Sequence, residues 1–166
     1  MKKTLIVVDM QNDFISMALG TPEALAIVEN VKKRINEALE QGYEVIYTRD
    51  THAENYLDTP EGKKLPVPHC IKGTEGWQIY DGVYADGCRI IDKPNFGWQK
   101  WDEEELYNVE LIGLCTDICV VSNALIIKTL FPEAHVAVNS SCTAGVTPES
   151  HDAALLTMKM CQIDVI

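Results

Sequence analysis

Short apolar runs rich in β-branched residues recur along the chain. They predict buried strands at residues 4–9, 44–48, 89–93, 109–114, 134–138 and 162–166. The segments between them predict helices at residues 22–42, 101–106, 118–130 and 148–160. Strands that alternate with helices form parallel sheets that are covered on both faces and joined by right-handed crossovers. The pattern therefore predicts an α/β fold, a three-layer α/β/α domain around a mostly parallel sheet of about six strands.

The segment from Pro22 to Gly42 has the clearest helical period. Its apolar residues recur at spacings of three and four positions: Leu25, Val28, Val31, Ile35 and Leu39. The basic residues at 32–34 lie off this stripe, and the glycine after it is a typical helix terminator. Residues 51–88, in contrast, have no clear period and are rich in Pro, Gly, Thr and His. Because so long a connection is usually functional, we expect it to contribute to a site.

Length and composition are those of an ordinary globular domain, which we expect to span residues 1–166. Apolar residues make up 46% and charged residues 23% of the chain. The formal net charge of −11 argues against binding to nucleic acid or to an anionic membrane, because both need a basic surface. The apolar stretch Leu5–Val8 is too short for a secretory signal, and no stretch reaches the roughly 18 apolar residues of a membrane span. We therefore expect a cytoplasmic protein.

Six cysteines are many for this length, and they lie at positions 70, 88, 115, 119, 142 and 161. None of them form a C-x-x-C pair, so a thiolate zinc site is not expected. In a reducing compartment disulfides are not expected either. Most of these cysteines are therefore interpreted as small buried apolar residues.

Chemically active residues gather at the carboxyl ends of the predicted strands, where parallel sheets bind ligands. Asp9 ends the first strand, Asp50 follows the second, and Lys93 ends the third. Cys115 and Cys119 follow the fourth. Taken singly, an aspartate after a strand is commonly a turn former, and a lysine is usually a solvated surface charge. Two acids, an amine and thiols at one edge of the sheet together indicate a catalytic site.

Cys119 is the residue best placed to act as a nucleophile. It follows a Thr-Asp pair at 116–117, typical N-cap residues, so we expect it at the amino end of a helix. The positive helix end and the Lys93 ammonium would lower its thiol pKa by about two units. Asp9 would take the thiol proton and pass it to a leaving group. Cys115, at the end of the strand, is better placed to lend its backbone N–H than its sulfur.

A second group of candidate ligands lies in and beside the long connection. Asp50 and His52 are two positions apart, so both side chains can face one point on an extended chain. With His69 they form a set of one carboxylate and two imidazoles that suits Zn²⁺, Mn²⁺ or Fe²⁺ with open positions for water or substrate. Glu61 would add a ligand or support the ligands from outside. The simpler alternative is that Asp50 caps a turn and the histidines are ordinary polar loop residues.

Aromatic residues flank both groups. Phe14 lies five residues after Asp9, and Trp98 lies five residues after Lys93, with Phe96 between them. Residues of these types are more often core than pocket. Their positions nevertheless make all three candidates for the walls of a shared substrate cleft.

Five short motifs resemble those of cysteine hydrolases in the isochorismatase-like superfamily, which includes the nicotinamidases. They are, in chain order, "LIVVDMQNDF" (5–14), "TRDTH" (48–52), "HCIKGTEGW" (69–77), "KPNFG" (93–97) and "GLCTDICV" (113–120). Each motif is short, but together they extend over nearly the whole chain. The resemblance implies the isochorismatase-like fold.

The resemblance also implies a mechanism. Asp9, Lys93 and Cys119 would form a triad that attacks an amide carbonyl, passes through a thioester and releases ammonia or an amine. A non-proline cis bond between Leu114 and Cys115 would aim the backbone amides of Cys115 and Cys119 into an oxyanion hole.

The same resemblance bears on metal, substrate and assembly. It implies a divalent metal, zinc first and Mn or Fe as alternatives, on Asp50, His52 and His69, where nicotinamidases hold the pyridine nitrogen. Nicotinamide is therefore the leading substrate. Nicotinamidases commonly carry an aromatic residue three positions before the second metal histidine, and this chain has Pro66 there. Homo-oligomers are common among similar proteins, so we expect one here.

Three other interpretations remain at this point. In the first, the same catalytic residues would hydrolyse a different substrate, another small carbamoyl or ureido amide. Alternatively, the protein would be a redox protein that pairs Cys119 with Cys115. A third hypothesis is a metal-binding module without turnover.

Overall fold

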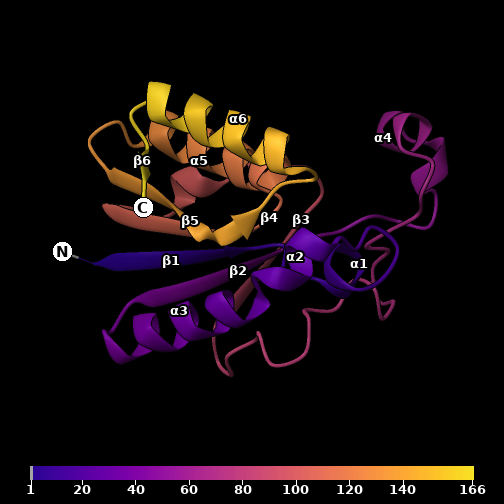
Figure 1. Ribbon diagram of the computed structural model, residues 1–166, viewed down its shortest axis with the longest axis horizontal. Helices are drawn as coiled ribbons and strands as arrows, with labels where there is room; N and C mark the ends of the chain where they lie inside the picture. Colours follow the sequence, from indigo (N-terminus) through magenta and orange to yellow (C-terminus); the bar gives the residue numbers. More distant parts are fainter. Residues whose placement is uncertain (1) are drawn as a thin grey trace.

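The computed structural model describes residues 2–166, which contain a six-stranded sheet (Figure 1). The strands are β1 (Lys3–Val8), β2 (Glu44–Asp50), β3 (Arg89–Lys93), β4 (Asn108–Leu114), β5 (His135–Ala144) and β6 (Asp164–Val165). Their spatial order is β3-β2-β1-β4-β5-β6, and every neighbouring pair is parallel. The predicted α/β fold is confirmed.

Helices cover both faces of this sheet (Figure 1). One face carries α1 (Asn12–Ile15), α2 (Pro22–Ala26) and α3 (Val28–Glu40), and the other carries α5 (Val121–Leu130) and α6 (Pro148–Met160). Side chains alternate along β1: Leu5 and Val7 pack with the first group of helices, and Ile6 and Val8 with the second. Because the strands are buried on both faces, they appear in the sequence as nearly continuous apolar runs.

The order of the strands places the crevice that such sheets use for ligands. From β1 the chain passes outward to β2 and β3, and it then returns to β4 on the other side of β1. The carboxyl ends of β1 and β4 therefore border the point where the strand order reverses. Ligands bind at this point in open parallel sheets.

The helix predicted at 22–42 is two helices. Ile27 separates α2 from α3, and Leu25 and Leu39 are 52% and 40% exposed. The face of α3 that packs on the sheet is made of Val28, Val31, Ile35 and Ala38. The predicted stripe was wrong at both ends: Leu25 lies before the break, and in α3 the position that faces the sheet after Ile35 is Ala38 and not Leu39.

Several other boundaries also differ from the prediction. The helix expected at 101–106 is a 3-10 turn at Trp101–Glu103, where Trp101 is fully buried. The last strand is only Asp164–Val165, and β5 continues to Ala144 through an irregularity in its pairing with β4. The helix expected at 118–130 begins earlier, with a π-helical turn at Thr116–Val120 that leads into α5. Tertiary packing sets these boundaries, which local sequence patterns specify poorly.

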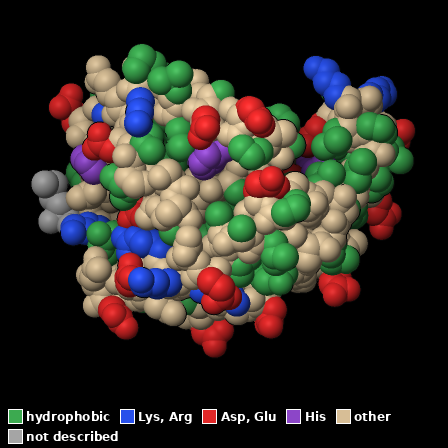
Figure 2. Space-filling model, viewed as in Figure 1, with side chains coloured by type: hydrophobic (Ala, Val, Ile, Leu, Met, Phe, Trp, Pro, Cys, Tyr) green, Lys and Arg blue, Asp and Glu red, His purple; other side chains and the backbone are tan. Residues whose placement is uncertain are grey.

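The long connection after β2 contains short elements of its own. A 3-10 turn (Tyr56–Asp58) and α4 (Pro60–Lys64) project beyond the carboxyl end of the sheet (Figure 1). Isolated bridges join His52 to Ile71 and Gln11 to Ile79, so the connection returns to the body of the protein at these points. Acidic side chains are scattered over the face in Figure 2, and basic ones appear at the tip of this projection. Within residues 2–166, no helix has the length and apolar character needed to span a membrane.

Candidate active site

Asp9, Lys93 and Cys119 meet at the carboxyl edge of the sheet. Lys93 Nζ lies 2.6 Å from Asp9 Oδ2 and 3.4 Å from Cys119 Sγ. Thr48 Oγ1 donates a hydrogen bond of 2.6 Å to the other carboxylate oxygen of Asp9. Asp9 and Lys93 are fully buried, and Cys119 is 4% exposed. The ammonium group therefore contacts both the acid and the thiol in a site that is largely closed to water.

Burial dominates the titration of these groups. It raises the pKa of the Cys119 thiol well above its usual value, and the negative charge of Asp9 raises it further despite Lys93. The expected lowering of this pKa is wrong, and the resting thiol is neutral. Burial also raises the pKa of Asp9, which makes its carboxylate a better proton acceptor. Burial alone would lower the pKa of Lys93, but the nearby carboxylates of Asp9 and Asp50 raise it overall, so the amine stays protonated.

A tight turn carries Cys119 from the end of β4 to this position. The peptide bond between Leu114 and Cys115 is cis, as the resemblance implied. The backbone N–H groups of Ile118 and Val120 donate to the Cys115 carbonyl at 3.1 and 3.0 Å, which closes the turn. The backbones of Cys115 and Cys119 thus lie in one compact turn, which suits their proposed role in an oxyanion hole.

The Thr-Asp pair of this turn does not cap the helix as predicted. Thr116 Oγ1 lies 2.7 Å from His151 Nδ1, and Asp117 Oδ1 accepts a hydrogen bond of 3.2 Å from the Val146 N–H. The N-cap position is Cys115, which makes no side-chain cap. Both polar side chains instead tie the turn to α6 and the segment before it.

A cavity of about 400 Å³ opens beside Cys119. It is lined by Phe14, Leu19, Asp50, Pro60, Glu61, Lys64, Leu65, His69, Phe96, Cys115, Ile118 and Cys119. Phe14 and Phe96, two of the three predicted wall residues, face this space. Trp98 does not, because it packs against the core between the sheet, α5 and α6. After Phe96 the backbone turns toward α5, where the Trp98 N–H donates to Asn123 Oδ1, and this turn directs the indole into the core.

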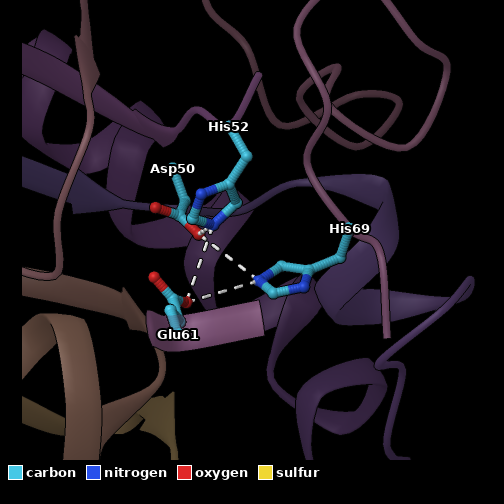
Figure 3. A group of neighbouring side chains, drawn as sticks. All are labelled: Asp50, His52, Glu61 and His69. Atoms are coloured by element: carbon cyan, nitrogen blue, oxygen red, sulfur yellow. Dashed lines mark hydrogen bonds and ion pairs between the residues drawn. The ribbon is translucent and has the colours of Figure 1, made fainter. Parts of the chain in front are cut away.

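Asp50, His52, Glu61 and His69 converge close to the triad, where Asp50 Oδ1 lies 3.8 Å from Lys93 Nζ, and all but His52 line the same cavity (Figure 3). Their ligand atoms all lie within 4.8 Å of one another. His52 Nε2 is 3.0 Å from Asp50 Oδ2 and 3.6 Å from Glu61 Oε1, and His69 Nε2 is 3.6 Å from the same Asp50 oxygen. Glu61 reaches this group from α4, so the structure brings it together with the three predicted ligands.

These residues fit a divalent cation. Atoms that bind zinc tetrahedrally lie about 3.4 Å apart when each is about 2.1 Å from the ion, close to the spacing observed here. His69 Nδ1 lies 2.8 Å from the Val67 carbonyl, which can only accept, so His69 Nε2 presents a lone pair to the group. Burial alone would raise the pKa of Asp50, but the two imidazoles and Lys93 hold it below its usual range. Asp50 is therefore ionised, as a metal ligand must be.

The sequence interpretation missed residues that hold the ligands in place. Gln11 is fully buried, donates to the Asp50 and Trp77 carbonyls at 2.9 Å each and accepts from the Asp50 N–H at 2.8 Å. Asp13 Oδ2 accepts a 2.7 Å hydrogen bond from the N–H of Cys70, next to His69. The signal was present: polar residues that directly follow a buried strand at alternating positions.

Comparisons with known proteins agree with this geometry. The family described as "Isochorismatase domain" matches residues 3–166. The chain belongs to the isochorismatase family. The nicotinamidase/pyrazinamidase of Mycobacterium tuberculosis is 25% identical to it over an alignment that covers 99% of this chain and 98% of that protein.

Solved structures of the isochorismatase family superpose over nearly the whole chain. The nicotinamidase/pyrazinamidase PncA from Bacillus subtilis has a TM-score of 0.87 at 27% identity and covers 99% of both chains. The pyrazinamidase of Pyrococcus horikoshii in complex with zinc has a TM-score of 0.86 at 26% identity, covering 100% of this chain and 99% of that one. The isochorismatase-like fold predicted from the five motifs is therefore confirmed.

Proposed function

We propose that the protein is a cysteine amidohydrolase that cleaves the C–N bond of a small amide, with nicotinamide as the leading substrate. The observation that carries this proposal is the contact of Lys93 with both Asp9 and Cys119 beside an apolar cavity. The similarity to nicotinamidases and pyrazinamidases over the full chain supports the reaction class.

In the first half-reaction, Cys119 Sγ attacks the amide carbonyl carbon and its proton passes to Asp9. The Lys93 ammonium stabilises the negative charge that passes between the thiol and the acid. Backbone N–H groups of Cys115 and Cys119 stabilise the oxyanion of the tetrahedral intermediate. Asp9 then donates its proton to the leaving nitrogen, the C–N bond breaks, and ammonia leaves a thioester on Cys119.

In the second half-reaction, water attacks the thioester carbonyl while Asp9 accepts a proton from the water. The C–S bond breaks, the proton returns to the sulfur, and the carboxylic acid product leaves. The raised pKa of Asp9 suits both directions of proton transfer.

The proposed cofactor is a divalent metal, zinc first and manganese or iron as alternatives. Asp50, His52, Glu61 and His69 would hold it. When bound, it supplies a Lewis-acid site for a lone pair of the substrate, such as a ring nitrogen. The Phe14 ring lies beside His69, with 5.5 Å between the ring centroids, so a flat heteroaromatic amide can contact both the metal ligands and an apolar wall.

The cavity favours an aromatic amide over a carbamoyl or ureido compound. Phe14, Leu19, Ile118 and Phe96 supply apolar walls that suit a flat ring better than a polar ureido group. Pro66, which stands where nicotinamidases commonly carry an aromatic residue, is not among the residues that line the cavity, whereas its neighbour Leu65 is. The substitution of proline at this position therefore does not change the cavity wall directly.

The burial of these cysteines disfavours the redox hypothesis. Burial raises the pKa of Cys115 to about 12 and that of Cys119 well above its usual value. Redox-active thiols are commonly exposed and have lowered pKa values. The buried Cys119 thiol and the half-buried Cys115 thiol do not match that chemistry.

The decisive experiment measures ammonia release from nicotinamide, pyrazinamide and an N-carbamoyl amino acid. Wild type, Cys119→Ala and the exposed-site control Cys161→Ala are compared after chelation and after addition of Zn²⁺ or Mn²⁺. We expect turnover of the heteroaromatic amides that is lost in Cys119→Ala and kept in Cys161→Ala. Turnover of the carbamoyl compound alone would show that the substrate is a carbamoyl compound and not a heteroaromatic amide. Metal binding without any turnover would overturn the proposal in favour of a binding module.

Three further expectations belong with this proposal. Residues 1–166 act as one domain, which the two cores on a shared sheet support. The protein is expected to form a homo-oligomer and to be cytoplasmic. Size-exclusion chromatography with light scattering tests the first of these two, and cell fractionation tests the second.

A further inference from the structure

Asn123 lies one helical turn beyond Cys119 on α5 and is fully buried. Its side-chain amide takes part in four hydrogen bonds. Nδ2 donates to the carbonyls of Cys119 at 2.8 Å and Phe96 at 3.2 Å. Oδ1 accepts from the Trp98 N–H at 2.9 Å and from Trp101 Nε1 at 2.8 Å. One amide therefore joins the backbone of the nucleophile to the segment that follows Lys93.

The segment 94–98 is held against the active site at several points. Lys93 Nζ donates a hydrogen bond of 3.1 Å to the Asn95 carbonyl. A Cβ added to Gly97 would clash with the Ile126 side chain, so the segment packs closely on α5. The backbone on both sides of Phe96 is thus bound to residues next to the thiol.

Phe96 itself has little packing to fix its position. Its side chain lines the cavity together with Cys119, yet the residue is 45% exposed. Because solvent and not protein covers much of this ring, its position depends on the backbone that carries it. The hydrogen bond from Asn123 to the Phe96 carbonyl supplies that anchor.

We propose that Asn123 is a positioning residue that sets the size selectivity of the site. It holds Phe96 as a fixed wall beside Cys119, so that small flat acyl groups reach the thiol and bulkier ones do not. The inference rests on the proposed amide hydrolysis for its biological meaning. Access to the Cys119 sulfur, however, can be measured without any turnover.

Substitutions can separate this role from a general contribution to packing. Asn123→Asp is nearly isosteric and keeps the acceptor for Trp98 and Trp101, but it removes both donors. Asn123→Ser is a smaller, neutral alternative if the aspartate variant does not fold. The matched control is Trp101→Phe, which removes one hydrogen bond of Asn123 and leaves its bonds to Phe96 and Cys119 intact.

The experiment measures alkylation of Cys119 by iodoacetamide and by the bulkier N-phenylmaleimide, mapped by mass spectrometry. Exposed Cys161 serves as an internal reference in the same chain. We expect wild type and Trp101→Phe to favour the small reagent equally. In Asn123→Asp or Asn123→Ser that preference should fall about tenfold, the effect of losing roughly one positioning hydrogen bond. KM for nicotinamide should rise by a similar factor with kcat nearly unchanged.

Two results would overturn the inference. Either the preference for the small reagent is unchanged in both Asn123 variants, or Trp101→Phe reduces it as much as they do. If no amide is hydrolysed but the alkylation preference falls as expected, the proposed function fails and the role of Asn123 stands. If amides are hydrolysed and the preference does not move, the reverse holds.

Discussion

The two halves of the proposed active site are built in different ways. The thiol half, made of Asp9, Lys93 and Cys119, comes from the ends of β1 and β3 and from the turn after β4. In the metal half, only Asp50 lies on a strand, while His52, Glu61 and His69 come from the long connection 51–88. The sheet register therefore places the thiol half directly, and the metal half needs additional support.

That support comes from the segment after β1. Gln11 binds both backbone polar groups of Asp50, and Asp13 binds the N–H next to His69. Gly76 makes room for the second contact, because a Cβ there would overlap the Asp13 carboxylate. Since the same short segment follows Asp9, it links the two halves. Buried side-chain amides and carboxylates can therefore fix an irregular connection where no ladder of strand hydrogen bonds is present.

The largest expected effect is the loss of activity when the nucleophile of the thiol half is removed, compared with the removal of a ligand of the metal half. Cys119→Ala should lower kcat/KM for nicotinamide by about 10³-fold or more, because the covalent step is lost. His69→Ala should lower both metal content and activity. We expect the double variant to be hardly worse than Cys119→Ala, since both act on one reaction. Ammonia release and metal analysis measure this, and full additivity of the two losses would contradict it.

The next effect concerns stability of the thiol half. Lys93→Met leaves the buried Asp9 carboxylate without its cation and should lower the free energy of unfolding by about 3–5 kcal/mol. Adding Asp9→Asn should recover part of this stability but no activity. The control Lys100→Met removes an exposed lysine paired with Glu103 and should cost about 0.5 kcal/mol or less. Urea unfolding followed by circular dichroism measures all three, and equal losses in the two lysine variants would contradict the expectation.

A smaller effect tests the support of the metal half. Gln11→Ala should weaken metal binding by about 10- to 100-fold, as losses of residues that orient metal ligands commonly do. The rate of Cys119 alkylation should change little. Asn12→Ala, which removes an exposed hydrogen bond to the Glu75 carbonyl, is the control. Competition with a chromophoric chelator gives the affinity. A fall in Cys119 reactivity as large as the fall in affinity would show that the halves are not separable.

The mildest test is the pH dependence of the thiol. Because burial raises the pKa of Cys119, its thiolate fraction should rise about tenfold per pH unit from pH 6 to pH 9 without levelling. The sign follows from the thiol being neutral below its pKa. Iodoacetamide alkylation, mapped to Cys119 by mass spectrometry, measures the rate. A plateau below pH 8 would indicate a lowered pKa and would contradict the burial argument.

Much of the thiol half could be predicted from the sequence. Asp9, Lys93 and Cys119 each end or follow an apolar run, and parallel strands bring such positions to one edge. The pKa of Cys119 could not be predicted, because it depends on how deeply the neighbouring elements bury the sulfur. The position of Trp98 in the core could not be predicted either, because its distance of five residues from Lys93 does not determine toward which layer the loop turns.

The sequence by itself determined a mostly parallel α/β sheet and the set of reactive residue types at its carboxyl edge. The sheet follows from the hydrophobic periodicity, which is a pattern over a few neighbouring residues. The edge position of the reactive residues follows because they stand at the ends of the predicted strands. Only the tertiary structure decided that α4 brings Glu61 to the two histidines and that Gln11 holds Asp50. It also decided that Asn123 joins Cys119 to Phe96. These contacts join residues far apart in sequence, and their geometry depends on packing that no local pattern encodes.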